Sequence, residues 1–285
     1  MKVLVLGVTG MLGNAVFKLF SQDAQFEVFA TMRSASGLRY FSSESHSRLF
    51  TGVDVLNHDE LVAVFAQVQP DVVINCVGLI KQLADANDPL TALPINAMLP
   101  HRLSRLCALI DARLVHVSTD CVFSGRQGGY CESDTSDAED LYGKSKFIGE
   151  LQGMSHVITL RTSIIGHELN SHYALIDWFL SQSGPIKGFS RAVFSGLPTV
   201  ELARVIKDYV LPRPELNGLY HVAAKPINKF DLLGLVAQQY SKEIEIRKDD
   251  AFVIDRSLNA DAFGAASGYV APEWPILIQR MYDAK

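Results

Sequence analysis

The sequence predicts an α/β fold with a Rossmann-like, doubly wound parallel sheet and a smaller C-terminal lobe. Short apolar segments rich in Val, Ile and Phe alternate with helix-like segments through the first half of the chain, as expected for strands buried on both faces. The first apolar segment runs into a glycine-rich turn, and the alternation weakens after about Ile165. Such alternation is typical of right-handed βαβ units.

In chain order, the first half predicts six strands and the helices between them. The strands are expected over Val3–Leu6, Phe26–Ala30, Leu49–Val53, Val72–Asn75, Leu114–Ser118 and Val157–Leu160. The helices are expected over Met11–Ser21, His58–Gln67, Pro89–Ile110 and Tyr142–Gln152. Asn57 is the predicted N-cap of the second helix, and Glu60 three residues later completes a capping box.

The second half predicts fewer strands. Helices are expected over Trp178–Gln182, Thr199–Leu211 and Phe230–Tyr240, with a strand over Gly218–Val222. The tail, Asp255–Lys285, is loop-rich and ends in a helix-like stretch from Trp274. Because no internal repeat or low-complexity linker is found, the second half is expected to pack on the first as a smaller lobe.

Composition and charge argue against several classes of protein. The 285 residues are 48% hydrophobic and 20% charged, which is ordinary for a globular protein. A formal net charge of −5 argues against a dedicated nucleic-acid binder. The N-terminal apolar run is too short for a signal peptide, and no stretch approaches the ~20 apolar residues of a membrane span. Four widely spaced cysteines without a CxxC favour a reduced cytoplasmic protein, and the eight histidines lack metal-ligand spacing.

Three glycines stand on the turn between the first strand and the first helix. The pyrophosphate of a dinucleotide needs N–H groups at a helix N-terminus and a close approach of the backbone, and glycine permits both because it has no β-carbon. The GxxGxxG spacing differs from the GxGxxG fingerprint, and a turn that merely needs glycines is the alternative. The residues predicted to hold the dinucleotide here are Gly7, Thr9, Gly10, Met11, Leu12 and Gly13.

The end of the second strand predicts which dinucleotide binds. An Asp or Glu at this position would bind the ribose 2′-hydroxyl of NAD. The segment from Phe29 to Ser34 instead contains no acid and carries Arg33. Because an arginine fork matches the geometry of a 2′-phosphate, we expect NADP (NADPH), with a solvated loop arginine as the alternative.

Tyr142 and Lys146 form a YxxxK motif in a segment with helix character. Residues four apart on a helix share a face, so the phenol and the ammonium can serve one site. The ammonium is expected to lower the pKa of the phenol toward the range of acid–base chemistry. Upstream, Ser118, Thr119 and Asp120 end a predicted strand, where ligands bind in open α/β sheets. Surface residues on an ordinary helix and loop are the alternative.

These motifs occur together in the order of a known family. The glycine turn, Ser118–Phe123 (STDCVF) and Tyr142–Glu150 (YGKSKFIGE) together resemble the extended short-chain dehydrogenase/reductases. The chain is most similar to the dTDP-4-dehydrorhamnose reductase family, which has STDYVF, then YGxSKxxGE, then LRTS. Further similar segments are Leu160–Ser163, Gly196–Thr199, Gly218–His221 and Asp255–Leu258. The resemblance covers nearly the whole chain.

The resemblance implies an NADP-dependent oxidoreductase. NADPH would deliver hydride to carbon 4 of a nucleotide-linked 4-keto-6-deoxyhexose, in making a surface-polysaccharide sugar. Tyr142 would protonate the developing alkoxide, and Thr119 would hydrogen-bond the keto oxygen. Lys146 would bind the nicotinamide ribose and hold the pKa of Tyr142 down. We accordingly expect a dinucleotide-binding domain over 1–164 with a later return of about 197–223, a mainly substrate-binding lobe over 165–285, and a homodimer.

Other positions match the cofactor or substrate side of the family. Asp54 and Val55 match an adenine-contacting position, Cys76, Val77 and Gly78 lie at the strand end that passes the cofactor, and Asn96 matches a supporting position. The substrate-binding candidates are Asp120, Cys121, Arg191 and Arg256. Lys187 and Lys225 are further candidates for a diphosphate, and Trp178, Phe189 and Phe194 for a base. Each of these can instead be a surface charge or a core residue.

Cys121 departs from the family pattern. Reductases of the family usually carry tyrosine there, whereas the related nucleotide-sugar 4,6-dehydratases carry a glutamate that acts as a base in water elimination. Dehydration is therefore not expected, and a small, soft pocket-lining residue is the favoured interpretation over a nucleophile.

Two other functions stay open. An epimerase of nucleotide sugars would hold NAD tightly, and Arg33 argues against it. A non-catalytic regulatory subunit is the other, because the regulatory subunit of methionine adenosyltransferase is a relative with the same scaffold and fold does not fix function.

Overall fold

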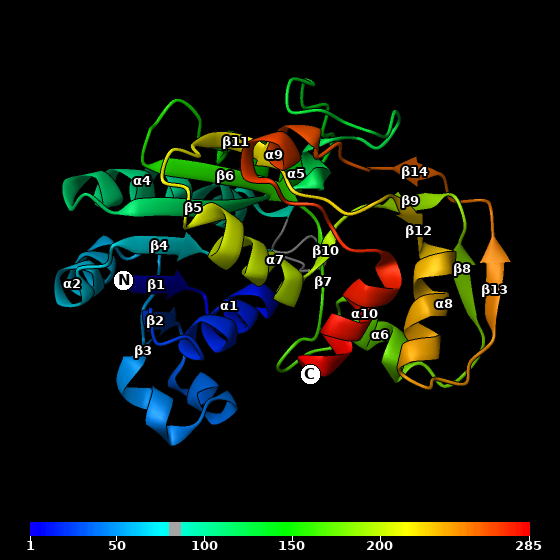
Figure 1. Ribbon diagram of the computed structural model, residues 1–285, viewed down its shortest axis with the longest axis horizontal. Helices are drawn as coiled ribbons and strands as arrows, with labels where there is room; N and C mark the ends of the chain where they lie inside the picture. Colours follow the sequence, from blue (N-terminus) through cyan, green and yellow to red (C-terminus); the bar gives the residue numbers. More distant parts are fainter. Residues whose placement is uncertain (80–86) are drawn as a thin grey trace.

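Within the described residues, 1–79 and 87–285, the computed structural model is built around a seven-stranded parallel sheet (Figure 1). Its strands are β1 (Lys2–Leu6), β2 (Glu27–Met32), β3 (Leu49–Thr51), β4 (Val72–Asn75), β5 (Arg113–Thr119), β6 (Val157–Thr162) and β11 (Gly218–His221). They lie in the order β11-β6-β5-β4-β1-β2-β3, with every neighbouring pair parallel. The predicted fold class is confirmed, and the order reverses beside β1, where doubly wound folds bind ligands.

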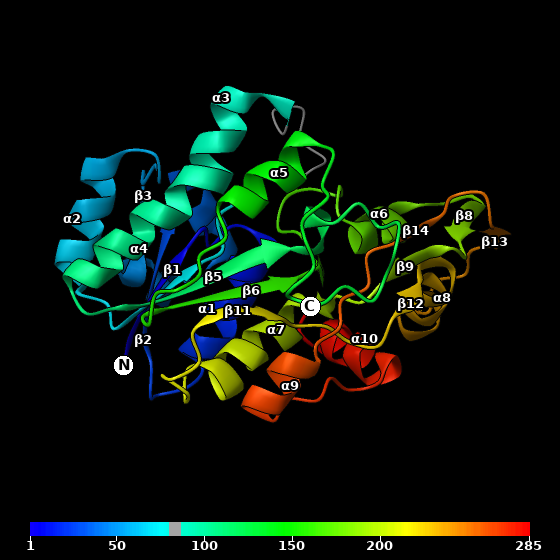
Figure 2. The ribbon, with the colours of Figure 1, turned by 90° about the horizontal axis from the view of Figure 1, so that it is seen from above.

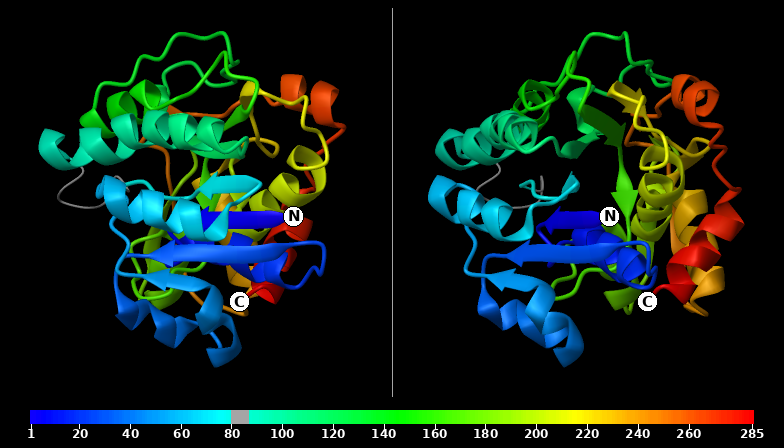
Figure 3. Two further views of the ribbon diagram at one scale, coloured as in Figure 1. Left: turned by 90° about the vertical axis from the view of Figure 1, so that its left-hand side faces the viewer. Right: turned by 60° about the vertical axis from the view of Figure 1, so that its left-hand side comes forward.

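Helices cover both faces of this sheet, because alternate strand residues point to opposite sides. The covering helices are α1 (Met11–Ser21), α2 (His58–Val68), α4 (Leu99–Leu109) and α7 (Thr199–Val205), which continues as the π-helical η6 (Ile206–Val210). Val3 and Val5 belong to the core shared with α1 and α7, and Leu4 and Leu6 to the core shared with α2 and α4. Figures 2 and 3 show the two helical layers on opposite sides of the sheet.

The long helix predicted over Pro89–Ile110 is interrupted. It consists of α3 (Pro89–Ala92), the π-helical η4 (Leu93–Met98) and α4. Pro94 and Pro100 lack a backbone N–H, and a proline ring clashes with the carbonyl one turn earlier, so a wider turn is favoured. The N–H of Leu99 accordingly donates to the carbonyl of Pro94, five residues back.

Helix α5 (Leu141–Ile148) ends before the predicted Gln152. Gly149 is its C-cap, and a β-carbon on Gly149 would lie 2.0 Å from the backbone oxygen of Asn96. The helix end is therefore pressed against η4. Two unpredicted 3-10 helices, η1 (Ala35–Tyr40) and η2 (Ser43–Arg48), follow β2, because such short turns carry little hydrophobic periodicity.

The residues after β6 form a second group of elements, many of them on the right of Figure 1. They are β7 (Ile164–Ile165), α6 (Leu175–Ser181), β8 (Ile186–Phe189), β9 (Ala192–Phe194), β10 (Leu197–Pro198), β12 (Ile227–Asn228), α8 (Lys229–Gln239), β13 (Ile246–Asp249), β14 (Ile254–Asp255), α9 (Asp261–Ser267) and α10 (Trp274–Asp283). Strand β13 pairs with β8, and β9 lies between β12 and β14. Strand β11 returns to the main sheet beside β6, and α7 packs on α1. The two-domain division stays a prediction.

None of the helices in the described part of the chain is long and apolar enough to cross a membrane.

Candidate active site

The glycine-rich turn joins β1 to α1 with almost no spare volume. Gly7 has a φ of +84°, which residues with a side chain rarely adopt. A β-carbon on Gly13 would lie 2.2 Å from the Gly7 carbonyl oxygen, and one on Gly7 would lie 2.8 Å from Val77 Cγ2. Glycine at these positions therefore lets α1 begin close to β1 and to the segment after β4.

The N-terminus of α1 presents backbone donors to a ligand. Its N-cap is Gly10, and among the described residues no side chain caps it and no acid lies in its first turn. The first N–H groups of a helix have no partner within it, and the helix dipole favours an anion there. Thr9 and Met11 flank the N-cap, whereas the Leu12 side chain is buried in the core, which leaves only its backbone to contact a ligand. The turn fits a pyrophosphate.

The loop after β2 lies against this turn. A β-carbon on Gly37 would lie 2.8 Å from Thr9 Cγ2, so the two segments approach closely. Arg33 is exposed directly after β2, and Arg39 is a second exposed arginine within η1. Sequence reasoning missed Arg39, because it did not predict the 3-10 turn that folds this segment back. Arg33 and Arg39 thus flank Gly37 in the sequence, and a guanidinium group matches the chemistry of a 2′-phosphate.

Asp54 and Val55 follow β3, where Asp54 shapes a tight turn. Asp54 Oδ1 accepts from the N–H of Leu56 at 2.9 Å, and the Asp54 N–H donates to Glu60 Oε2 at 2.6 Å. Asn57 caps α2 as predicted, but Glu60 bonds the Asn57 side-chain amide, at 2.8 Å, instead of its backbone N–H. The capping box is corrected in this respect, because the turn at Asp54 presents a competing N–H. The adenine contacts stay a prediction.

The segment after β4 runs beside Lys146. Asn75 Oδ1 accepts from the N–H of Val77 at 3.1 Å and fixes the strand end. A β-carbon on Gly78 would lie 3.7 Å from Lys146 Nζ. Burial raises the pKa of the Cys76 thiol to about 12, which keeps the thiol neutral. The predicted cofactor segment and the predicted catalytic lysine are therefore neighbours.

Lys146 is 5% exposed, and its ammonium can donate more hydrogen bonds than the one that it makes within the protein. Its Nζ donates to the carbonyl of Val117 at 2.9 Å. Burial lowers the pKa of Lys146 to about 8, and the carboxylate of Glu150 opposes this effect. An ammonium has three N–H donors, so the others can bind the hydroxyl groups of a ribose.

The Tyr142 phenol lies among Thr119, Asp120 and Cys121. Burial raises the pKa of Tyr142, the charges of Cys121 and Asp120 add to this, and a hydrogen bond with the Thr119 side chain opposes it. The expectation that Lys146 lowers this pKa is wrong for this structure, because the ammonium bonds a backbone carbonyl while acidic groups surround the phenol. The phenol stays protonated and can donate a proton.

Asn96, in the π-helical η4, holds α5 in place. It is 2% exposed, its Nδ2 donates to Ser145 Oγ at 3.2 Å, and its Oδ1 accepts from the N–H of Leu79 at 3.0 Å. Ser145 lies between Tyr142 and Lys146 along α5. The wide turn of η4 thus places one amide between α5 and the segment after β4.

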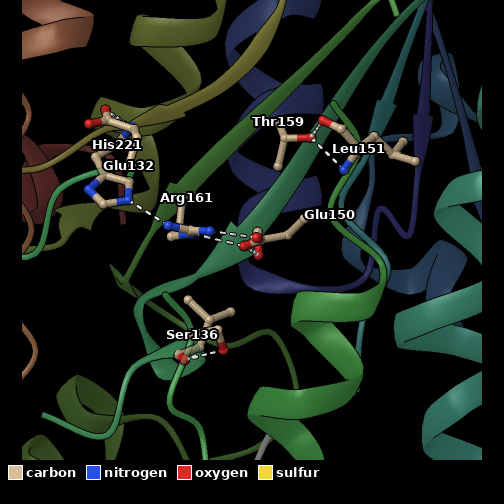
Figure 4. Close-up of polar contacts among 9 residues, drawn as sticks. Glu132, Ser136, Glu150, Leu151, Thr159, Arg161 and His221 are labelled. Carbon is tan, nitrogen blue, oxygen red and sulfur yellow. Dashed lines mark hydrogen bonds and ion pairs between the residues drawn. The ribbon is translucent and has the colours of Figure 1, made fainter. Parts of the chain in front are cut away.

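A buried ion pair anchors the residues just beyond α5 to β6 (Figure 4). Arg161 donates through Nε to Glu150 Oε1 at 2.9 Å and through Nη2 to Oε2 at 2.6 Å. Its Nη1 contacts His221 Nε2 at 2.9 Å. The side chains of Glu150 and Arg161 are each 2% exposed. We call Glu150, Arg161 and His221 the saturated cluster.

The tautomer of His221 follows from its neighbours. Arginine only donates, so His221 Nε2 accepts, and Nδ1 carries the proton that is donated to the carbonyl of Tyr130 at 3.0 Å. Burial lowers the pKa of His221, which keeps the ring neutral. Ser118 Oγ also donates to Glu150 Oε1, at 2.7 Å. The saturated cluster therefore connects β5, β6 and β11 to the end of α5.

Three of the four substrate-binding candidates come together. Arg256 Nε donates to the carbonyl of Phe123 at 2.8 Å, and its Nη1 lies 3.8 Å from Cys121 Sγ. Asp120 is 7% exposed, and burial raises its pKa against the charge of Arg256. The fourth candidate, Arg191, is exposed between β8 and β9.

The remaining candidates have structural partners. Lys187 forms a surface ion pair with Asp249 at 2.9 Å, and Lys225 forms one with Glu273. Phe194 is buried against Trp274, and Phe189 packs on Phe252 with ring centroids 5.3 Å apart. Trp178 is 37% exposed on α6. The two lysines are surface charges, and Phe194 is a core residue.

No group of three or more His, Cys, Asp or Glu side chains in residues 1–79 and 87–285 is arranged to hold a metal ion.

A comparison with protein families now adds to this geometry. Residues 1–253 match the family described as RmlD substrate binding domain. The chain belongs to this family. It is an RmlD-like extended short-chain dehydrogenase/reductase, and the predicted resemblance is confirmed.

Curated proteins of two kinds are among those similar to this chain. Methionine adenosyltransferase 2 subunit beta of Pongo abelii is 31% identical over 260 residues, 84% of this chain and 72% of that protein. The Bos taurus subunit aligns over only 41% of its own length. The dTDP-4-dehydrorhamnose reductase of Aggregatibacter actinomycetemcomitans is 24% identical over 234 residues, 79% of this chain and 74% of that protein.

A solved RmlD-family enzyme has the same fold. The dTDP-4-dehydrorhamnose reductase from Bacillus anthracis, in complex with NADP, gives a TM-score of 0.80 at 19% identity, over 100% of this chain and 98% of that chain. At this identity the likeness shows the fold alone.

Sequence reasoning missed several residues of the site. Glu150 and Arg161 stand within the quoted motifs YGKSKFIGE and LRTS, but the motifs do not reveal that they pair. Lys229 carried no signal, because its relation to Cys121 and Arg256 exists only in the folded chain.

Proposed function

We propose that this RmlD-family chain is an NADPH-dependent reductase of the 4-keto group of a nucleotide-linked 4-keto-6-deoxyhexose, in the biosynthesis of surface-polysaccharide deoxysugars. The observation that carries the proposal is the Tyr142 phenol, held protonated beside the Thr119 side chain and on the same helix as Lys146. Reduction of a ketone needs an acid at the oxygen, and a protonated phenol supplies it.

The geometry supports a role for each residue toward the cofactor. Bound NADPH supplies the hydride that adds to carbon 4. The turn at Gly7 and the N-terminus of α1 hold its pyrophosphate, and Arg33 holds its 2′-phosphate. Lys146 binds the nicotinamide ribose through the donors that its bond to Val117 leaves over.

At the substrate, two side chains act on the keto oxygen. The Thr119 hydroxyl hydrogen-bonds it and orients the carbonyl. As the carbon–hydrogen bond forms at carbon 4, the carbonyl π bond breaks, and the Tyr142 phenol gives its proton to the oxygen to complete the alcohol. This leaves a phenolate on Tyr142, which regains a proton from water before the next turnover. Cys121 offers no carboxylate base, so elimination of water is not part of the proposal.

The test is a deuterium transfer experiment. The protein is incubated with NADPH deuterated at the transferable position and with dTDP- or UDP-linked 4-keto-6-deoxyglucose, and the product is examined by NMR. The proposal expects deuterium at carbon 4 and stoichiometric NADP formation. Isomerised sugar without NADPH consumption would instead identify an epimerase.

A second candidate is a regulatory subunit. It is favoured by the identity of 31% to methionine adenosyltransferase 2 subunit beta, against 24% to the reductase relative. This candidate expects NADPH binding without turnover, and co-purification with a methionine adenosyltransferase catalytic subunit. Turnover of the keto sugar without such co-purification supports the reductase. We further propose a cytoplasmic homodimer, testable by light scattering.

A further inference from the structure

Lys229 is a partly buried cation in the C-terminal half of the chain. It is the first residue of α8, and none of the described residues forms a hydrogen bond or ion pair with its ammonium. Its electrostatic neighbours are Asp120, Cys121 and Arg256. We call Asp120, Lys229 and Arg256 the open cluster.

The second cation of the open cluster is also only partly satisfied. Arg256 donates to the carbonyl of Phe123 and lies against Cys121 Sγ, and no carboxylate of the described residues forms an ion pair with it. A guanidinium has five N–H donors in a planar fork that matches phosphate oxygens. Most of these donors are not used by the bond to Phe123.

The charges of the open cluster do not cancel. Two cations face one carboxylate, Asp120, whose burial disfavours its charged form. Charges removed from water are normally paired, because an unpaired one carries a large desolvation cost. The exposed lysines of the same lobe, Lys187 and Lys225, each have a carboxylate partner. The excess positive charge therefore indicates an anion that the described residues, 1–79 and 87–285, do not provide.

The position of the open cluster fixes where this anion would lie. Arg256 contacts Cys121, which follows Thr119 by two residues and acts electrostatically on the Tyr142 phenol. An anion held here would lie near the side chains proposed to act on the keto oxygen. In a nucleotide-linked hexose, one pyranose ring separates carbon 4 from the diphosphate on carbon 1, so a diphosphate subsite is expected near the group that protonates that oxygen.

We propose that Lys229 and Arg256 bind the diphosphate of the sugar nucleotide. This inference deepens the proposed function, because the diphosphate belongs to the proposed substrate. Lys229 is then a residue that selects nucleotide-linked sugars over free sugars. Arg256 shares this role and also fixes the loop at Phe123.

The experiment measures the affinity of the full chain for UDP and for dTDP by calorimetry, so it does not depend on turnover. Lys229→Met and Lys229→Gln are compared with wild type, with Lys229→Arg as the charge-keeping variant and Lys225→Met as the matched control. Loss of a charged hydrogen bond is expected to weaken binding by about 10- to 100-fold. Lys229→Arg should restore most of the affinity, and Lys225→Met should leave it unchanged. Melting temperatures identify any variant that fails to fold.

The outcomes separate this inference from the proposed reductase. Unchanged UDP and dTDP affinity in folded Lys229→Met or Lys229→Gln overturns the inference, as does a wild type that binds neither nucleotide. If wild type reduces a keto sugar but the Lys229 variants bind UDP and dTDP as tightly as wild type, the diphosphate site is wrong and the reductase proposal stands. Affinity lost in the Lys229 variants, with no reduction of any keto sugar, supports the inference and removes the reductase.

Discussion

The saturated cluster and the open cluster contain the same kinds of group but differ in how their charges are matched. Arg161 is paired in a bidentate way with Glu150 and also donates to His221. Lys229 and Arg256 share one buried carboxylate with which neither forms an ion pair. Matched charge indicates a structural role, because nothing remains for a ligand to neutralise. Unmatched charge beside Tyr142 indicates a binding role.

Both clusters lie next to residues of the candidate active site. The saturated cluster joins β5, β6 and β11 to the end of α5 and so positions Tyr142 and Lys146. The open cluster is formed by residues from the strand end, from α8 and from the segment after β14. Substitutions that remove one charge at a time test whether the two clusters differ in this way.

The largest effect is expected for Glu150→Gln. Removing the carboxylate leaves Arg161 buried with an unmatched charge, and breaking a buried pair in this way costs about 3–5 kcal/mol of unfolding free energy. Urea denaturation measures it. Glu273→Gln is the control, because its pair with Lys225 is exposed, and exposed pairs contribute only about 0–1 kcal/mol. Equal costs for the two variants would remove the distinction between the clusters.

A smaller effect is expected for Arg33→Asp. This substitution tests whether the Arg33 side chain, which follows β2, binds the 2′-phosphate of NADPH. Arg33 is exposed beside the glycine turn, and an acid there repels a 2′-phosphate and can bind a 2′-hydroxyl. The ratio of kcat/KM for NADPH to that for NADH is expected to fall by about 10- to 100-fold. An unchanged ratio places the recognition elsewhere, and Arg39→Asp then tests the second exposed arginine.

A still smaller effect is expected in the dependence of kcat/KM on pH. Because the pKa of Lys146 is about 8, its positive charge is lost as the pH rises through that value. The rate is expected to fall by up to about tenfold per pH unit above it. Glu150 raises the pKa of Lys146, so Glu150→Gln should move the fall to lower pH. A flat profile up to pH 10 contradicts the assignment of Lys146.

The smallest effect concerns His221. Its pKa is lowered in the folded chain, so below its ordinary value of 6.5 the unfolded chain takes up the proton first. The stabilisation is present above pH 6.5 and is lost as the pH falls, by at most about 1.4 kcal/mol per unit. His221→Gln can still accept from Arg161, and its unfolding free energy should depend less steeply on pH between 7 and 5. Identical slopes for the two proteins would speak against a neutral His221.

The sequence predicts the parts of this molecule that depend on local rules. The alternating segments predict the parallel sheet. The glycines predict the turn between β1 and α1, because only glycine permits so close an approach of the backbone at Gly7 and Gly13. The YxxxK spacing likewise places Tyr142 and Lys146 on one helix. These features need no knowledge of distant residues.

The parts that could not be predicted depend on contacts between distant segments. The break at η4 follows from two prolines and from packing against Gly149, which lies on another helix end. The pKa of Tyr142 depends on groups from the strand end, and the environment of Lys229 depends on Arg256 from far along the chain. Residue types indicate which charges exist, but only the fold shows which of them are matched.

The central claim, that Tyr142 donates a proton during NADPH-dependent reduction, is tested most directly by one comparison. Wild type and Tyr142→Phe are assayed for NADPH oxidation with dTDP-, UDP- and GDP-linked 4-keto-6-deoxy sugars, and NADPH binding is measured for both. We expect turnover of at least one sugar by wild type, at least about 100-fold slower turnover by the variant, and nearly equal NADPH affinity. Wild-type rates in Tyr142→Phe, or NADPH binding without turnover of any sugar, would contradict the claim.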